Sequence, residues 1–145
     1  MAMAVLRALG ALGCRRPAVV TAYTKPVDDA LRGFLVAHGI CPGPVTGLDF
    51  TDVLAVEAVP TSTLVAAAHT ALSGTPGADS VLISCGGLRT LDAVATLESE
   101  LGLAVVSSSL AGPWDVLGLA GYAPIAPRTS RLLATTWADF KSGPG

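Results

Sequence analysis

Short apolar runs that end in a turn alternate with amphipathic segments along most of this chain. The apolar runs have the length and the β-branched content of buried strands, and they lie at residues 17–23 (PAVVTAY), 81–84 (VLIS) and 103–107 (LAVVS). The amphipathic segments have helical spacing, and they lie at residues 4–12, 27–37, 61–72, 90–101 and 112–119. Strands that alternate with helices form a parallel sheet covered on both faces, so the pattern predicts an α/β fold.

The least regular part of the pattern is residues 40–60, where Pro42, Gly43, Pro44 and Gly47 interrupt any long helix or strand. We predict a short strand at residues 45–50 and one helical turn near Val53. The additional strand completes a mostly parallel, four-stranded sheet in a flavodoxin-like, three-layer domain.

The predicted domain spans residues 1–121, and residues 122–145 form a C-terminal tail. This tail contains Pro124, Pro127 and a terminal SGPG, so we expect it to be partly mobile. The chain has 145 residues, which is the length of about one ordinary domain.

The charge of the chain argues against two classes of partner. Its formal net charge is −2, and it has no block of basic or acidic residues, which gives no support for a nucleic acid or a membrane surface as partner. Charged residues break every long apolar stretch before about 18 residues, the length that a membrane-spanning helix needs. We therefore expect a soluble, cytoplasmic protein.

The cysteines do not form a recognised metal or disulfide pattern. Cys14, Cys41 and Cys85 are an odd number, and their spacing matches neither CxxC nor a box of cysteine and histidine ligands. We expect no disulfide framework, no metal and no cofactor.

Three predicted strands end in residues that can react or form hydrogen bonds. Tyr23 ends the first, Cys85 follows the third and precedes Gly86 and Gly87, and Ser107 ends the last. The carboxyl ends of parallel strands meet at one edge of the sheet, where ligands bind. Glycines in such a turn let backbone N–H groups approach and stabilise an anion. On this evidence, Cys85 is either a proton-transferring thiol or a small side chain buried in a tight turn.

Two of these strand ends also have a purely structural interpretation. Ser107, Ser108 and Ser109 are expected to cap the helix that follows them. Tyr23, judged by its position alone, is an aromatic side chain at the end of a strand.

A longer segment around Cys85 carries a more specific pattern. Residues 83–121 contain S-C-x-x-L-x-T-L-D, then a helix, a V-V-S-S strand end and a helix with a tryptophan. This block resembles the arylmalonate decarboxylases and maleate isomerases of the aspartate/glutamate racemase superfamily. Residues 5–23, which end in T-A-Y, resemble a helix and strand of the same family. The resemblance covers residues 4–121, and the glycine pair after Cys85 favours the decarboxylase.

The resemblance implies roles for five residues. Cys85 is expected to protonate one face of a planar enediolate, or to attack the alkene in an isomerase. The Gly86 N–H and the Tyr23 hydroxyl are expected to hold the substrate carboxylate as part of a dioxyanion hole. Val53 and Val56 match positions that line a small apolar pocket, in which removal of water favours loss of CO2.

The resemblance also implies that the chain corresponds to the C-terminal half of a two-domain enzyme. In the racemases, the other half supplies a partner cysteine, and neither Cys14 nor Cys41 lies where the family places it. We predict a cofactor-independent, cysteine-dependent decarboxylase of malonate-type dicarboxylic acids that works through an enediolate. The alternatives are a maleate cis-trans isomerase, an Asp/Glu racemase-like enzyme and a truncated domain without activity. A small dicarboxylic acid is the expected substrate, and a second copy of the chain in a homodimer is a further expected partner.

Overall fold

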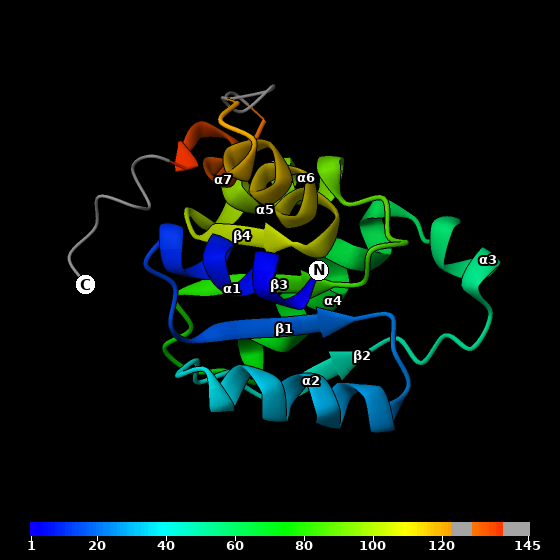
Figure 1. Ribbon diagram of the computed structural model, residues 1–145. Coiled ribbons are helices and arrows are strands. Elements are labelled where there is room, and N and C mark those ends of the chain that lie inside the picture. Colours follow the sequence, from blue (N-terminus) through cyan, green and yellow to red (C-terminus); the bar gives the residue numbers. More distant parts are fainter. Residues whose placement is uncertain (123–128, 138–145) are drawn as a thin grey trace.

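A four-stranded parallel sheet lies at the centre of the molecule (Figure 1). The computed structural model describes residues 1–122 and 129–137, apart from the side chain of Val53. The strands are β1 (Pro17–Thr21), β2 (Val45–Gly47), β3 (Ser80–Ser84) and β4 (Ala104–Ser107), in the order β2-β1-β3-β4. All three pairings are parallel, and this order is the flavodoxin-like one. The predicted α/β fold is therefore confirmed.

Helices cover both faces of this sheet. Their bounds are α1 (Ala2–Ala11), α2 (Lys25–Ala37), α3 (Val53–Glu57), α4 (Thr61–Ser73), α5 (Leu91–Leu101), α6 (Ser108–Leu119) and α7 (Arg131–Ala134). Helices α4 and α5 share one apolar core with the sheet, and α1, α2, α6 and α7 share the other (Figure 1). Among the described residues, no helix is long and apolar enough to cross a membrane.

The two cores result from the alternation of side chains along each strand. Ile83 packs in the core with α4 and α5, whereas its neighbour Leu82 packs in the core with α1 and α6. Val19 pairs with Leu82 across β1 and β3, and Leu82 pairs with Val106 across β3 and β4. Every residue of β1, β3 and β4 is buried, which explains why these strands are apolar runs without a polar face.

Several predicted boundaries differ from the structure, and three of them lie at the edge where the strands end. Strand β1 ends at Thr21 instead of Tyr23, because the Tyr23 N–H donates to the Thr21 hydroxyl at 3.3 Å and the chain turns there. Strand β2 ends at Gly47 instead of residue 50, just before Asp49, whose φ of 55° is left-handed. Helix α6 begins at Ser108 instead of residue 112, because the Ser107 side chain caps it.

Part of the predicted tail packs on the domain. Leu132 of α7 is fully buried in the core that includes α1 and α6, and the indole N–H of Trp114 donates to the carbonyl of Thr135 at 2.9 Å. Residues 129–137 thus add to the core. The predicted mobile end and the prolines at 124 and 127 lie outside the described residues.

Candidate active site

Three neighbouring strands bring their carboxyl ends to one edge of the sheet. Tyr23 lies just beyond β1, Cys85 directly follows β3, and Ser107 is the last residue of β4. Strand β3 pairs with β1 on one side and with β4 on the other. These three predicted site positions therefore lie at the same edge, as the parallel arrangement requires.

The loop that carries Cys85 is fixed at both ends. Cys85 itself is half-buried, and its carbonyl accepts a hydrogen bond from the N–H of Leu88, which is buried. At the far end of the loop, the Thr90 hydroxyl donates to Ser107 Oγ at 2.8 Å and lies 2.6 Å from Ser109 Oγ. The loop that carries the thiol is thus anchored by β3 at its start and, through Thr90, by the first turn of α6 at its end.

The two glycines of the loop have different surroundings. A Cβ at Gly86 would have the Met1 methyl as its nearest neighbour, at an ordinary contact distance of 3.8 Å, so a methyl group fits at this position. A Cβ at Gly87 would lie 3.3 Å from Val56 Cγ1 and 3.9 Å from Cys85 Sγ. Val56 of α3 is buried, so an apolar wall lies close to the thiol.

The helix that follows the loop is not directly at the thiol. Helix α5 begins at Leu91, beyond the whole loop of residues 85–90, so the positive end of its dipole is not adjacent to Cys85. Helix α6 instead begins directly at the edge, and the predicted capping is confirmed for Ser107, whereas Ser108 and Ser109 are the first two residues of the helix.

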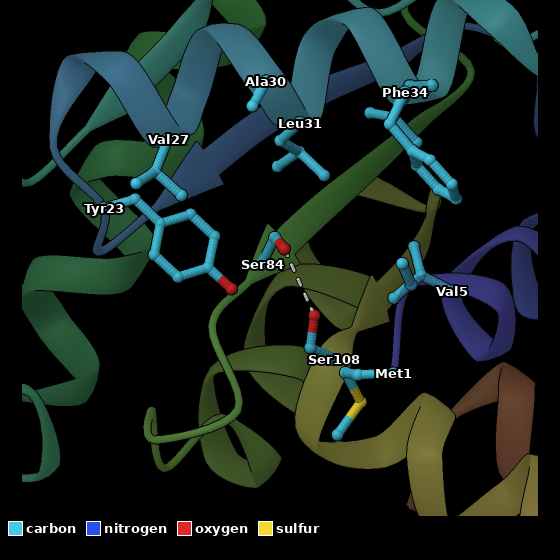
Figure 2. Close-up of a pocket in the computed structure, with 11 residues that line it drawn as sticks. Met1, Val5, Tyr23, Val27, Ala30, Leu31, Phe34, Ser84 and Ser108 are labelled. Carbon is cyan, nitrogen blue, oxygen red and sulfur yellow. Dashed lines mark hydrogen bonds between the residues drawn. The ribbon is translucent and has the colours of Figure 1, made fainter.

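A cluster of hydroxyl groups lies on the other side of the same strand ends. Ser84 and Ser108 are buried, and their oxygens are 3.3 Å apart. Figure 2 shows both side chains together with that of Tyr23, which comes from the end of β1. Burial raises the pKa of Tyr23, a hydrogen bond with Ser84 acts in the opposite direction, and the nearby Cys85 adds to the rise. The Tyr23 hydroxyl therefore keeps its proton at neutral pH and can donate it in a hydrogen bond.

Comparison with known proteins identifies the family. The sequence profile of the arylmalonate decarboxylase family matches residues 1–133. The chain belongs to the arylmalonate decarboxylase family. Arylmalonate decarboxylase of Bordetella bronchiseptica is 46% identical over 121 residues, which are 83% of this chain and 50% of that protein. The chain spans about half the length of the curated relatives it matches.

Solved structures agree with this family assignment. A mutant of arylmalonate decarboxylase in its liganded form is 44% identical, with a TM-score of 0.86 over 90% of this chain and 56% of that chain. Maleate cis-trans isomerase of Nocardia farcinica, as a mutant with a covalently bound succinylcysteine intermediate, is 30% identical, with a TM-score of 0.81. That comparison covers 90% of this chain and 52% of the isomerase. The resemblance inferred from residues 83–121 is thus confirmed.

Four of the five predicted site residues lie at this edge in the described part of the chain. Cys85, Gly86 and Val56 lie around the loop, and Tyr23 lies beyond the end of the neighbouring strand. Val53 is the first residue of α3, and its side chain lies outside the description. Within residues 1–122 and 129–137, no three histidine, cysteine or acidic side chains could hold a metal ion together.

Sequence reasoning missed the parts played by Ser84 and Thr90. Ser84 precedes Cys85, so its side chain points to the opposite face of the sheet, and this alternation is the signal that could have placed it beside Tyr23. Thr90 is the threonine of the T-L-D pattern, but its partners Ser107 and Ser109 are distant in sequence. No local pattern pairs these hydroxyls.

Proposed function

We propose that this chain is the cysteine-bearing domain of a cofactor-independent decarboxylase that acts on malonate-type dicarboxylic acids. One observation carries the proposal: the half-buried Cys85 follows β3 and packs against the apolar cluster that contains Val56, and Tyr23 lies just beyond the end of the neighbouring strand β1. The thiol is thus next to an apolar surface, and a hydrogen-bond donor lies at the same sheet edge. A decarboxylase that uses an enediolate needs both environments next to one proton donor.

Each group has a defined task in the proposed reaction. The Tyr23 hydroxyl and the Gly86 N–H bind the carboxylate that remains, and the apolar surface of Val56 removes water from the carboxylate that leaves. The bond between the central carbon and the leaving carboxylate breaks, CO2 departs, and its electron pair stays in the enediolate. The Cys85 thiol then gives its proton to the central carbon, and the resulting thiolate takes a proton from water.

Decarboxylation is favoured over isomerisation by similarity and by the loop. Identity is 46% to the Bordetella decarboxylase and 30% to the Nocardia isomerase. At Gly86 a Cβ would meet the Met1 methyl at an ordinary contact distance of 3.8 Å, and the glycine pair after Cys85 is the feature that favours the decarboxylase by resemblance. The alternative with specific support is a maleate isomerase in which Cys85 attacks the alkene, because the Nocardia relative was solved with a succinylcysteine intermediate. A racemase-like enzyme or an inactive domain lacks such support.

The test is a substrate screen on two proteins. One is this chain alone, and the other is this chain joined to the half of the Bordetella relative that it does not match. Each is assayed with phenylmalonate, maleate and aspartate. We expect CO2 release from phenylmalonate, and Cys85→Ser should lower kcat at least about a hundredfold, which is the low end of what general acid catalysis contributes.

The matched control is Cys41→Ser, since Cys41 is a free and exposed cysteine outside the loop. It should leave turnover close to wild type, and circular dichroism should show that both variants are folded. Turnover of maleate without CO2 release from phenylmalonate would identify an isomerase instead. Retained activity in Cys85→Ser, or lost activity in Cys41→Ser, would contradict the assignment of the thiol.

We also propose that two copies of this chain form a homodimer when no other domain is joined to it. We further propose a cytoplasmic location. Large apolar side chains are exposed at the starts of α3 and α5, namely Leu54 (79%) and Leu91 (46%). Burial of such side chains in a homodimer would cover the site. Sedimentation of the chain tests this, and a monomer at all concentrations would oppose it. The three free cysteines support a reducing compartment.

A further inference from the structure

A polar groove lies at the edge of the sheet opposite to the candidate active site. It consists of two adjoining hollows of about 630 and 390 Å3, which share four lining residues, Arg16, Arg32, Pro42 and Gly43. Arg16 directly precedes β1, and Pro42 and Gly43 lie shortly before β2, so the shared part of the groove lies at the amino ends of these strands. Arg32 comes from α2, which lies beside β2 (Figure 1). The groove is therefore separate from the carboxyl ends of the strands, where Cys85 lies.

Two guanidinium groups in this groove have no partner in the described part of the chain. Within residues 1–122 and 129–137, the side chains of Arg16 and Arg32 form no ion pair and no hydrogen bond, and both are exposed. The other charged side chains of the groove are engaged: Lys25 pairs with Asp29, and the buried Asp28 accepts a hydrogen bond from a threonine hydroxyl. The positive charge available to a ligand thus lies on the two arginines.

Hydrogen bonds and close packing fix the backbone on both sides of the groove. The Asp79 carboxylate accepts the Arg16 N–H at 2.9 Å, and the Asp79 N–H donates to the Arg16 carbonyl at 3.2 Å. The same carboxylate also accepts the Ser80 hydroxyl at 2.7 Å, so its oxygens are already engaged. A Cβ at Gly43 would lie 1.9 Å from Thr75 Oγ1, so the segment before β2 packs directly against the loop after α4. The groove is therefore preformed, which lowers the entropic cost of binding.

We propose that this groove binds a small organic phosphate, with the phosphate group between the guanidinium groups of Arg16 and Arg32. A guanidinium presents its N–H groups as a planar fork, and two forks can hold the three free oxygens of one phosphate group, whereas a single fork already matches a carboxylate. A phosphate monoester carries a charge of about −1.5 to −2 at pH 7, which matches the two unpaired positive charges. Both hollows lie within the roughly 300–1,000 Å3 of small-molecule pockets.

An apolar surface next to the arginines can contact the organic part of the ligand. The smaller hollow is also lined by Val36, Ile40 and Pro42, and no acidic side chain lines it. Val36 is 51% exposed, so much of its apolar surface is open to a ligand. Contact with this surface adds affinity in proportion to the apolar area that it removes from water. An organic phosphate should therefore bind more tightly than inorganic phosphate.

The experiment is an NMR titration of the 15N-labelled 145-residue chain with phenyl phosphate, inorganic phosphate and benzoate at neutral pH. We expect saturable shifts for phenyl phosphate at the amides of Arg16, Arg32, Cys41 and Gly43, from which all affinities are measured. Benzoate has the same ring with a single carboxylate and should bind at least about tenfold more weakly. Inorganic phosphate should shift the same amides and bind at least about threefold more weakly. No turnover is required, so failure of the proposed decarboxylation would leave this result intact.

Charge-matched variants locate the binding. Arg16→Gln and Arg32→Gln should each weaken phenyl phosphate binding at least about tenfold, because each removes one charged fork, and either suffices if the other does not fold. Arg15→Gln is the control, since Arg15 is exposed and lines neither hollow, and its affinity should stay within about twofold of wild type. Absence of saturable shifts at the groove, equal affinity for benzoate or inorganic phosphate, or an equal loss in Arg15→Gln would overturn the proposal.

Discussion

Replacement of Gly86 by alanine should separate the binding role of the Cys85 loop from its folding role. Gly86 is not among the glycines with positive φ, and a Cβ there would have its nearest neighbour, the Met1 methyl, at an ordinary 3.8 Å. Alanine therefore fits the folded loop and restricts the unfolded chain, which should raise the free energy of unfolding by about 0.4–1 kcal/mol.

The same methyl group should impair the proposed reaction. In the proposed mechanism the Gly86 N–H holds the substrate carboxylate, a methyl group on the same residue would crowd that carboxylate, and losing a hydrogen bond to a charged group costs about 1.5–3 kcal/mol. At 1.36 kcal/mol for each factor of ten, kcat/KM should fall roughly ten- to a hundredfold. Stability and activity are thus expected to change in opposite directions.

Gly87→Ala provides the matched comparison. Its Cβ would lie 3.3 Å from Val56 Cγ1, inside the favourable contact distance of about 3.5–4.0 Å, so it should destabilise the fold by about 1 kcal/mol. Urea denaturation of the chain measures the stabilities, and CO2 release by the chain joined to the other half of the Bordetella relative measures the activity. If Gly86→Ala is destabilising, or if it keeps wild-type kcat/KM while folded, the inferred role of this N–H is wrong.

Four further substitutions test other parts of the structure. Burial raises the pKa of Asp28, so the folded state favours the protonated carboxyl. The contribution of this group to stability is therefore present below its unfolded pKa and is lost as the pH rises through its folded pKa. At pH 7, Asp28→Asn should be more stable than wild type, as measured by urea denaturation. Asp115 is 8% exposed and binds Arg7 at 2.7 Å, so Asp115→Ala should cost about 2 kcal/mol in the same assay, whereas Asp29→Ala, at an exposed ion pair, should cost less than about 0.5 kcal/mol. Tyr23→Phe should lower kcat/KM at least about tenfold with circular dichroism unchanged, since it removes the donor hydroxyl.

The sheet could be predicted from the sequence because its strands are buried on both faces. Runs such as VLIS before Cys85 are continuous and apolar, and glycines such as Gly39 and Gly102, both with positive φ, end the helices between them. Strand ends were predicted less well. The turn after Thr21 depends on a hydrogen bond that the Tyr23 N–H donates to the Thr21 hydroxyl, and a run of apolar residues does not show where such a bond ends the ladder.

The edge of the site could be predicted, but its internal arrangement could not. Parallel strands bring Tyr23 and Cys85 to one edge whatever the details of packing. The anchoring of the loop through Thr90 and Ser107 joins residues on different elements, and the cavity between α1 and α2 (Figure 2) depends on how far these two helices stand apart. Both follow from tertiary packing, which periodicity does not encode.

The end of β3 explains how one short segment serves two different environments. Successive residues of a strand point to opposite faces, so Ile83 and Cys85 pack with the core that contains α4 and α5, whereas Ser84 lines the cavity beside α1 and α2. A shift of this strand end by one residue would place the hydroxyl against Val56 and the thiol among the serines. The apolar surface that favours loss of a carboxylate would then face the wrong group. The order Ser84-Cys85 is therefore a requirement of the proposed chemistry, and exchanging the two residues should abolish activity even though the composition of the site stays the same.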